Sequence, residues 1–259
     1  MRFALGIEYD GEGFCGWQTQ ATGCAIQNHV ERAVSQIAGH EVTLTSAART
    51  DTGVHALGQV VHFDSEVQRP LNAWVRGVNS LLPATISATW VRAVSSEFHA
   101  RYSARYRHYR YILLSRAVRS AITKVGWTHL PLQRDRMITA AQYLLGVQDF
   151  SAFRSSECQA NTPIRTLSKL EITQHGEYFI FDLSANAFLH HMVRNIVGSL
   201  VYVGSGKYPP GRIKEILDSR DRSNAAPTFS PSGLYLTGVS YDEKWKFPSS
   251  NAGFLLLPA

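Results

Sequence analysis

The order of strand-like and helix-like segments constrains the fold of this chain more than any other feature. Up to residue 100, the hydrophobic pattern predicts strands at 2–10, 41–47, 57–64 and 85–94, and helices at 25–39 and 71–82. Beyond residue 100, it predicts strands at 105–114, 165–174, 177–185 and 233–241, and helices at 132–146, 188–204 and 210–220. Apart from the helix at 210–220, both parts follow the order β-α-β-β-α-β.

This repeated order predicts an α+β protein with two ferredoxin-like, or RRM-like, βαββαβ halves. We expect largely antiparallel sheets that are joined around a central cleft. The division should fall near residue 100, which gives halves at 1–100 and 101–259. Many unrelated proteins share this topology, so the fold alone does not indicate a function.

The charge distribution favours a nucleic-acid partner. The chain has a net charge of +6 and a pI near 9.3, with 20 Arg against 6 Lys. Arginine binds phosphate with a planar fork and stacks on bases, whereas lysine is a point charge. From Phe98 to Arg134 there is no Asp or Glu, and arginines alternate with tyrosines. This pattern is typical of an RNA-binding surface, although a solvated strand face would give it too.

Several other classes of protein are excluded. Cys15, Cys24 and Cys158 are odd in number and form no CxxC pair, which argues against a disulfide framework and a zinc site. The N-terminal residues include Glu8 and Asp10, so they do not resemble a signal peptide. No apolar run is long enough to span a membrane. We expect a cytoplasmic protein with no membrane partner.

Two motifs that suggest a bound cofactor or metal ion do not support one. Residues 11–16 match GxGxxG, but the next helix starts too late to place its N-terminus at a pyrophosphate. His190 and His191 are adjacent on an expected helix, so their side chains should point in different directions, and neither has a ligand one turn away. We therefore expect no cofactor and no metal ion.

Two charged residues stand out as candidates for a site. Asp51 lies in Arg49-Thr50-Asp51-Thr52-Gly53, just before a strand. An Asx-turn would explain an aspartate there, but a basic environment would also keep it ionised as a nucleophile or base. Arg194 lies in the middle of an expected helix that is apolar nearly all round. A buried guanidinium is costly without a partner, so we expect an acid from elsewhere in the chain.

The motif RTDTGVHA at 49–56 resembles the catalytic aspartate motif of the tRNA pseudouridine synthases of the TruA family. Further stretches resemble other signatures of this family in the same order, and together they cover nearly the whole chain: ALGIEYDG, GWQTQ, FHARYSA, YRYIL, LLGVQDFSAFR and ANAFLHHMVRNIVGSL. The chain departs from the family pattern at Ala48, where Gly is usual, and at Thr52, where Ala is common. Both changes are small and affect the loop more than the chemistry.

The resemblance implies the conversion of uridine to pseudouridine in the anticodon stem-loop of tRNA, at positions 38 to 40. It implies that Asp51 is the catalytic residue, that Arg194 keeps it charged and that Tyr109 stacks on the flipped base. Arg49 would contact backbone phosphate. It also implies a homodimer and no cofactor. The family pattern does not say whether Asp51 attacks the base or the sugar or removes the C2′ proton.

Two alternatives remain open. One is a noncatalytic RNA-binding protein with two RRM-like domains, although the sequence contains no RNP-type octet. The other is a related pseudouridine synthase that acts on another RNA. The apolar C-terminus, GFLLLPA at 253–259, is expected to dock on its own or a partner subunit.

Overall fold

The computed structural model describes residues 1–121 and 124–248, and these form two compact units. The first unit contains residues 1–105 and the chain from Tyr235 onward, and the second contains residues 106–234. The main elements of the first unit are β1 (Arg2–Tyr9), α1 (Ile26–Ala38), β2 (Thr45–Ser46), β3 (His55–Asp64), α2 (Leu71–Asn79), β4 (Ile86–Val94) and most of β10 (Leu234–Ser240). Those of the second unit are β5 (Tyr106–Ser115), β6 (Gly126–Thr128), α3 (Arg134–Ala141), β7 (Gly146–Asp149), β8 (Ile164–His175), β9 (Tyr178–Ala185), α4 (Met192–Gly204) and α5 (Arg212–Ser219).

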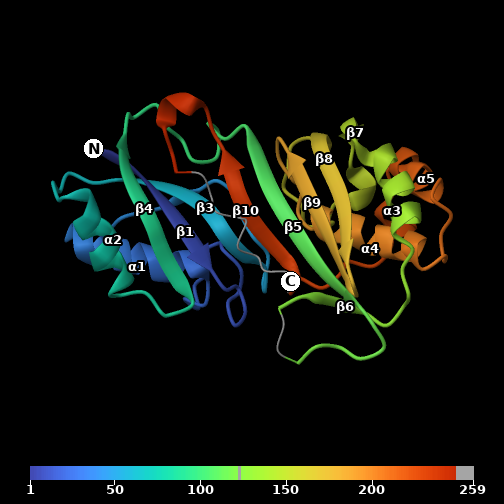
Figure 1. The fold of residues 1–259 in the computed structure, drawn as a ribbon. Coiled ribbons are helices and arrows are strands. Elements are labelled where there is room, and N and C mark those ends of the chain that lie inside the picture. The colour runs from blue at the N-terminus through green and yellow to red at the C-terminus, as the bar shows by residue number, and fades with distance from the viewer. Residues whose placement is uncertain (122–123, 249–259) are drawn as a thin grey trace. The chain divides into compact units, whose positions relative to one another are not determined.

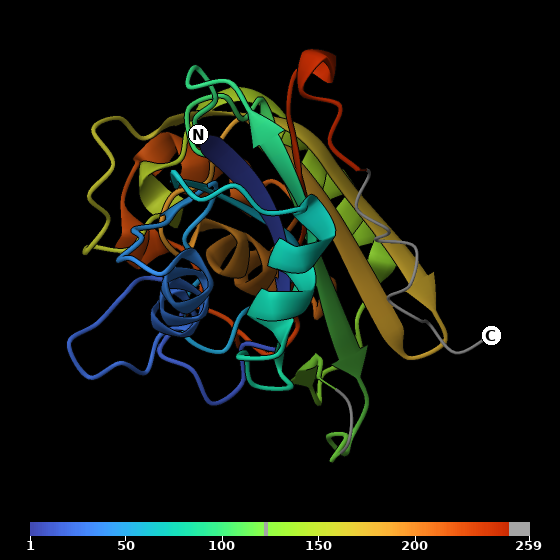
Figure 2. The ribbon, with the colours of Figure 1, turned by 90° about the vertical axis from the view of Figure 1, so that its left-hand side faces the viewer.

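The sheet of the first unit has the order β4-β1-β3-β10, with β2 paired to β3. β1 is antiparallel to β3 and β4, and β10 is parallel to β3. α1 and α2 lie side by side against one face of this sheet (Figures 1 and 2). α1 forms there because Ile26, Val30 and Val34 recur at helical spacing and are fully buried, and Gly39 ends it with a φ of 73°.

The sheet of the second unit has the order β5-β9-β8-β7, with β6 parallel to β5. The β5, β9, β8 and β7 pairings are antiparallel. α3, α4 and α5 lie together beside this sheet (Figure 1). α4 is the core helix, because almost all of its residues are buried, including the polar Asn195 and Ser199. The α+β class with mainly antiparallel pairing is thus confirmed, and the ferredoxin-like description of each half stays a prediction.

The units differ from the expected halves in the last strand. We expected β10 to belong with residues 101–259, but its Tyr235 and Leu236 pair with His55 and Ala56 of β3. The ring of Tyr235 also stacks on that of His55, with centroids 4.7 Å apart. The chain therefore returns to the first unit after completing the second. Residues 253–259, for which we expected docking, lie outside the described residues.

The expected strand at 41–47 is wrong for most of its length, since β2 covers only Thr45 and Ser46. The reason is that side chains of α1 take the backbone donors of this segment. Leu44 N donates to Glu31 Oε1 at 2.9 Å, and Val42 N donates to Ser35 Oγ at 2.9 Å. These donors satisfy their hydrogen bonds without a neighbouring strand.

Two expected helices differ most from the structure, and both are shorter than expected. The helix expected at 188–204 begins only at Met192, because His191 has a φ of 64° in the left-handed region. His190 and His191 therefore lie in a turn, with ring centroids 4.0 Å apart, and do not point in different directions along a helix as we had expected. The helix expected at 132–146 ends at Ala141 and is followed by a short 3₁₀ turn and the strand β7.

The cysteine interpretation is also corrected. Cys15 and Cys24 form a disulfide across the loop that joins β1 to α1, and Cys158 is free. The loop folds back on itself, with Cys15 N donating to Cys24 O at 3.1 Å, and this brings the two side chains together. The spacing of the two cysteines is not that of a CxxC motif, so the sequence pattern did not predict their pairing. Over the described part of the chain, every helix is too short or too polar to cross a bilayer.

Candidate active site

Asp51 lies in a tight turn that leads into β3 of the first unit. Val54 N donates to Asp51 O at 3.1 Å to close the turn. Gly53 has a φ of 76°, a conformation that glycine adopts without strain. The Asp51 side chain is half-buried, whereas Arg49 and Thr52 are exposed. The turn thus presents one partly exposed carboxylate, two residues after the exposed Arg49.

Buried polar side chains of the sheet hold the residues directly before this turn. Gln59 of β3 is fully buried, and its amide contacts both backbone groups of Ala48: Nε2 donates to Ala48 O at 2.7 Å, and Oε1 accepts from Ala48 N at 3.3 Å. The hydroxyls of Tyr9 and Thr50 share a buried hydrogen bond of 2.7 Å. Burial raises the pKa of Tyr9 well above its ordinary value, so its hydroxyl stays protonated. Thr50, directly before Asp51, is therefore fixed to β1 through Tyr9. Ala48, directly before Arg49, is fixed to β3 through Gln59.

The loop between β1 and α1 braces the same turn from another side. Trp17 N donates to Thr50 O at 3.0 Å. A Cβ added to Gly16 would lie 2.8 Å from Thr50 O and 3.1 Å from the carbonyl carbon of Asp51. Only glycine allows this approach, and its φ of 83° also favours glycine. Backbone contacts thus fix where the Asp51 side chain emerges.

Tyr109 lies on β5 of the second unit and is 7 % exposed. Its ring meets Phe188 edge-on, with centroids 5.0 Å apart and an interplanar angle of 83°. Edge-to-face contacts of this kind are favourable and fix the orientation of a ring. The contact with Phe188 therefore fixes the orientation of the Tyr109 ring, and only a small part of the residue is open to solvent.

Arg194 of α4 is half-buried in the second unit, and its Nε donates to Phe229 O at 2.8 Å. Phe229 also lies against Tyr111, with ring centroids 5.9 Å apart. Burial raises the pKa of Tyr111, and the nearby positive charge of Arg194 acts in the opposite direction. The guanidinium is thus held in place beside a buried aromatic cluster. Its pairing with Asp51 stays a prediction, because the two residues belong to different units.

The structure therefore brings Arg49 and Asp51 together in one loop and places Tyr109 and Arg194 in the second unit. Sequence reasoning missed the residues that support the loop, namely Tyr9, Gly16 and Gln59. A signal for two of them was present, since Tyr9 lies in ALGIEYDG and Gly16 begins GWQTQ. Gln59 gave no signal, because a polar residue in a strand is ordinarily assigned to the solvent face.

A family model described as tRNA pseudouridine synthase matches residues 6–103 and 140–242. The chain belongs to this family, as the motifs indicated. It is 55% identical over 253 residues to a tRNA pseudouridine synthase A of Nitrosomonas eutropha, which covers 97% of this chain and 91% of the relative. The tRNA pseudouridine synthase A of Dechloromonas aromatica is 52% identical, with 98% of each chain covered.

One solved structure gives a much weaker match than these relatives. A chain in a crystal structure of a Cbf5-Nop10-Gar1 complex has a TM-score of 0.38 and 14% sequence identity. The match covers 90% of this chain and 48% of that chain.

Proposed function

We propose that this protein converts uridine to pseudouridine at positions 38 to 40 in the anticodon stem-loop of tRNA, and that Asp51 is the catalytic residue. Membership of the family makes the protein an isomerase that acts on tRNA uridine. The observation that supports Asp51 is the construction of its turn. The backbone that carries the half-buried Asp51 is held through Ala48 by the buried Gln59, through Thr50 by the buried Tyr9, and by the close approach of Gly16. An ordinary surface turn does not need such support.

The chemistry needs one positioned carboxylate. The bond between N1 and C1′ breaks, the base turns, and a bond between C5 and C1′ forms. The hydrogen of C5 leaves, and N1 gains a proton, so the product is an isomer of the substrate. Asp51 can act in its ionised form, either by addition to the base or the sugar or by removal of the C2′ proton.

The other candidate residues have supporting roles in this proposal. A base in a stem is accessible only after it is flipped out, and the ring of Tyr109 would stack on it. Arg49 is exposed two residues before Asp51 and would hold a phosphate of the flipped nucleotide. Arg194 would supply the positive charge that keeps the aspartate ionised. We also propose a homodimer, which sedimentation at several protein concentrations would test.

The alternative of a noncatalytic RNA-binding protein predicts tRNA binding without turnover. A decisive assay uses tRNA with tritium at C5 of uridine, because C5 becomes the glycosidic carbon and its tritium passes to water. We expect release by the wild type and none by Asp51→Ala or Asp51→Asn, both with unchanged tRNA affinity. Asp135→Asn is the control, because this carboxylate on α3 is 87% exposed and its removal should not matter.

Each outcome of this assay has a clear meaning. Equal release by the wild type and Asp51→Ala would remove Asp51 from the mechanism. Tight tRNA binding with no release by the wild type would favour the binding protein. Release from a different RNA, with none from tRNA, would identify a related synthase of other specificity. Transcripts with a single uridine at 38, 39 or 40 show which positions are modified.

A further inference from the structure

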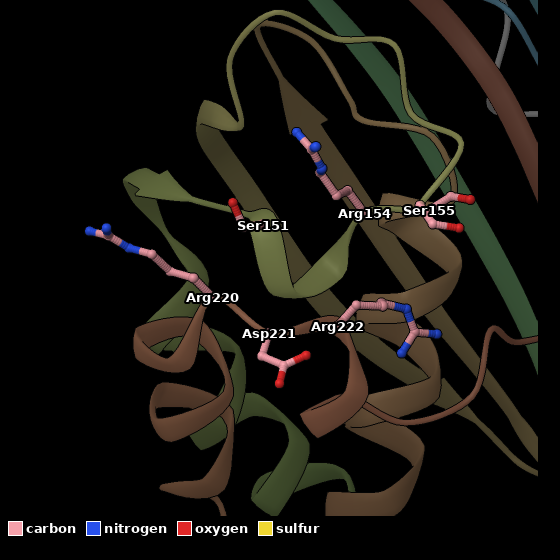
Figure 3. Close-up of a pocket in the computed structure, with 7 residues that line it drawn as sticks. Ser151, Arg154, Ser155, Arg220, Asp221 and Arg222 are labelled. Atoms are coloured by element: carbon pink, nitrogen blue, oxygen red, sulfur yellow. The ribbon is translucent and has the colours of Figure 1, made fainter.

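A pocket of about 400 Å³ lies within the second unit (Figure 3). One wall comes from the 3₁₀ turn Ser151–Phe153 and the loop after it, and the other from the end of α5 and the residues that follow. The lining residues are Ser151, Arg154, Ser155, Ser156, Arg220, Asp221 and Arg222. Three arginines and three serines are the side chains that proteins use to bind phosphate oxygens.

Two of these arginines, Arg154 and Arg222, form no ion pair with an acid in the part of the chain that the structure describes. Among the described residues, the guanidinium of Arg222 donates to neutral groups: to Asn195 Oδ1 and Thr228 Oγ1, each at 3.1 Å, and to Ala225 O at 3.3 Å. Burial lowers the pKa of Arg222, but a guanidinium stays protonated at any physiological pH. The guanidinium of Arg154 makes no hydrogen bond or ion pair within residues 1–121 and 124–248.

The acids at and near the pocket already have partners. Asp221 accepts a hydrogen bond from Ser223 N at 2.9 Å, and this bond lowers its pKa. Asp149 forms an ion pair with Arg220, with 3.2 Å between Asp149 Oδ2 and Arg220 Nε. Burial works to raise the pKa of Asp149, but hydrogen bonds from Ser151 and the charges of Arg220 and Arg154 outweigh it and lower the pKa. With Arg220 paired to Asp149, the lining keeps the charges of Arg154 and Arg222 against the one carboxylate of Asp221, and this net positive charge attracts anions.

The direction of the arginines indicates which kind of anion fits. Figure 3 shows the side chains of Arg154, Arg220 and Arg222 leaving the pocket rim in different directions. A site for one free phosphate needs donors that converge on a point, whereas spread donors suit successive phosphates of a strand. We infer that this pocket binds the sugar-phosphate backbone of the RNA substrate at neighbouring phosphates. The inference rests on the proposed function, because it assumes an RNA substrate.

The pocket is tied to the helix that carries Arg194. Asn195, which is fully buried, accepts from Arg222 and donates to Phe153 O at 2.8 Å. Ser155 N donates to His190 O at 2.9 Å, in the turn before α4. A backbone phosphate bound here would therefore lie at a fixed distance from Arg194, and the pocket would set the register of the RNA along the second unit.

The test uses Arg154, because its guanidinium makes no bond that the fold depends on. We would measure tRNA affinity of the full chain at several salt concentrations for the wild type, Arg154→Ala and Arg154→Lys. Arg212→Ala is the matched control, since Arg212 begins α5, about 10 Å along the helix from its other end, and is already paired with Glu215 at 2.9 Å. All these variants should fold, and their unfolding midpoints should match that of the wild type.

We expect Arg154→Ala to bind tRNA about tenfold more weakly at 0.1 M salt. The slope of log affinity against log salt should become shallower by about 0.7 to 0.9 for each phosphate that the variant no longer binds. Arg154→Lys should keep most of the slope, and Arg212→Ala should keep all of it. In tritium release, Arg154→Ala should raise KM and leave kcat unchanged, because Arg154 would bind the phosphate equally well before and during the reaction.

The inference would be overturned if Arg154→Ala had the same tRNA affinity, the same salt slope and the same KM as the wild type. Inorganic phosphate tests whether the pocket instead binds a small free anion. If phosphate weakened tRNA binding by the wild type but not by Arg154→Ala, and both proteins had the same slope of log tRNA affinity against log salt, the pocket would be a small-anion site and the inference would be wrong. A changed slope in Arg154→Ala, with no tritium release by the wild type, would support the pocket as an RNA site while the proposed isomerase function fails.

Discussion

Replacement of Gly16 by alanine tests whether the β1–α1 loop positions Asp51. The new Cβ would lie 2.8 Å from Thr50 O, and an ordinary contact needs at least 3.4 Å, so the Asp51 turn or the loop must move by about 0.6 Å. The positive φ of 83° adds about 1–2 kcal/mol of strain, and the clash adds about 1–3 kcal/mol. Gly16→Ala should therefore lower the free energy of unfolding by about 2–5 kcal/mol.

The same loop provides a matched control. Gly13 has a φ of 82°, and a Cβ there would meet nothing within 4 Å. Gly13→Ala should therefore show the strain of positive φ alone, about 1–2 kcal/mol, without a shift of the Asp51 turn. The difference between the two variants isolates the close approach of Gly16 to the turn.

Two assays measure the effect. Denaturant unfolding gives the stability of each variant, and single-turnover tritium release gives the rate of the chemical step. We expect release by Gly16→Ala to be roughly tenfold to a hundredfold slower, because small misplacements of a catalytic group are costly. Gly13→Ala should release tritium at the wild-type rate. Equal stability and equal rates in the two variants would refute the idea that this loop positions Asp51.

Three further predictions concern the first unit. Gln59→Leu removes two hydrogen bonds to the backbone of Ala48 and should cost about 2–4 kcal/mol of stability and slow tritium release, which the same two assays would measure. Burial, more than any neighbouring charge, lowers the pKa of His62 from 6.5 to about 4. Between those values the unfolded chain binds a proton that the folded chain does not, so stability should fall as the pH drops from 7 to 5, and less so in His62→Gln. Reduction of the disulfide between Cys15 and Cys24 should lower the free energy of unfolding by about 3 kcal/mol, and an unchanged value in dithiothreitol would contradict this.

Part of the candidate site was predictable because its signal is local. The Asp51 octet has two charged residues, Arg49 and Asp51, and a turn glycine, Gly53, just before a strand, and all of these features lie within a few residues of one another. Arg194 was found for a similar reason, since a charge inside an apolar helix is visible from periodicity alone. The resemblance to the family added the roles of these residues and of Tyr109.

Other features depended on contacts between distant segments. Gly16 approaches the Asp51 turn from a loop about 35 residues earlier, and no local pattern encodes such a distance. The left-handed conformation of His191 overrode a helical pattern that continued through it. Cys15 and Cys24 met because the loop folds back, which cysteine counting could not show.

The sequence by itself determined most of the longer helices and strands, the α+β class, the family and the Asp51 turn. These properties follow from side-chain periodicity, glycine placement and short motifs, which act over a few residues. Only the tertiary structure decided that β10 pairs with β3, that Gln59 and Tyr9 hold the turn, and that Arg154 and Arg222 line one pocket. Backbone donors and acceptors are nearly the same in every residue, so their choice of distant partner is fixed only when the whole core has formed.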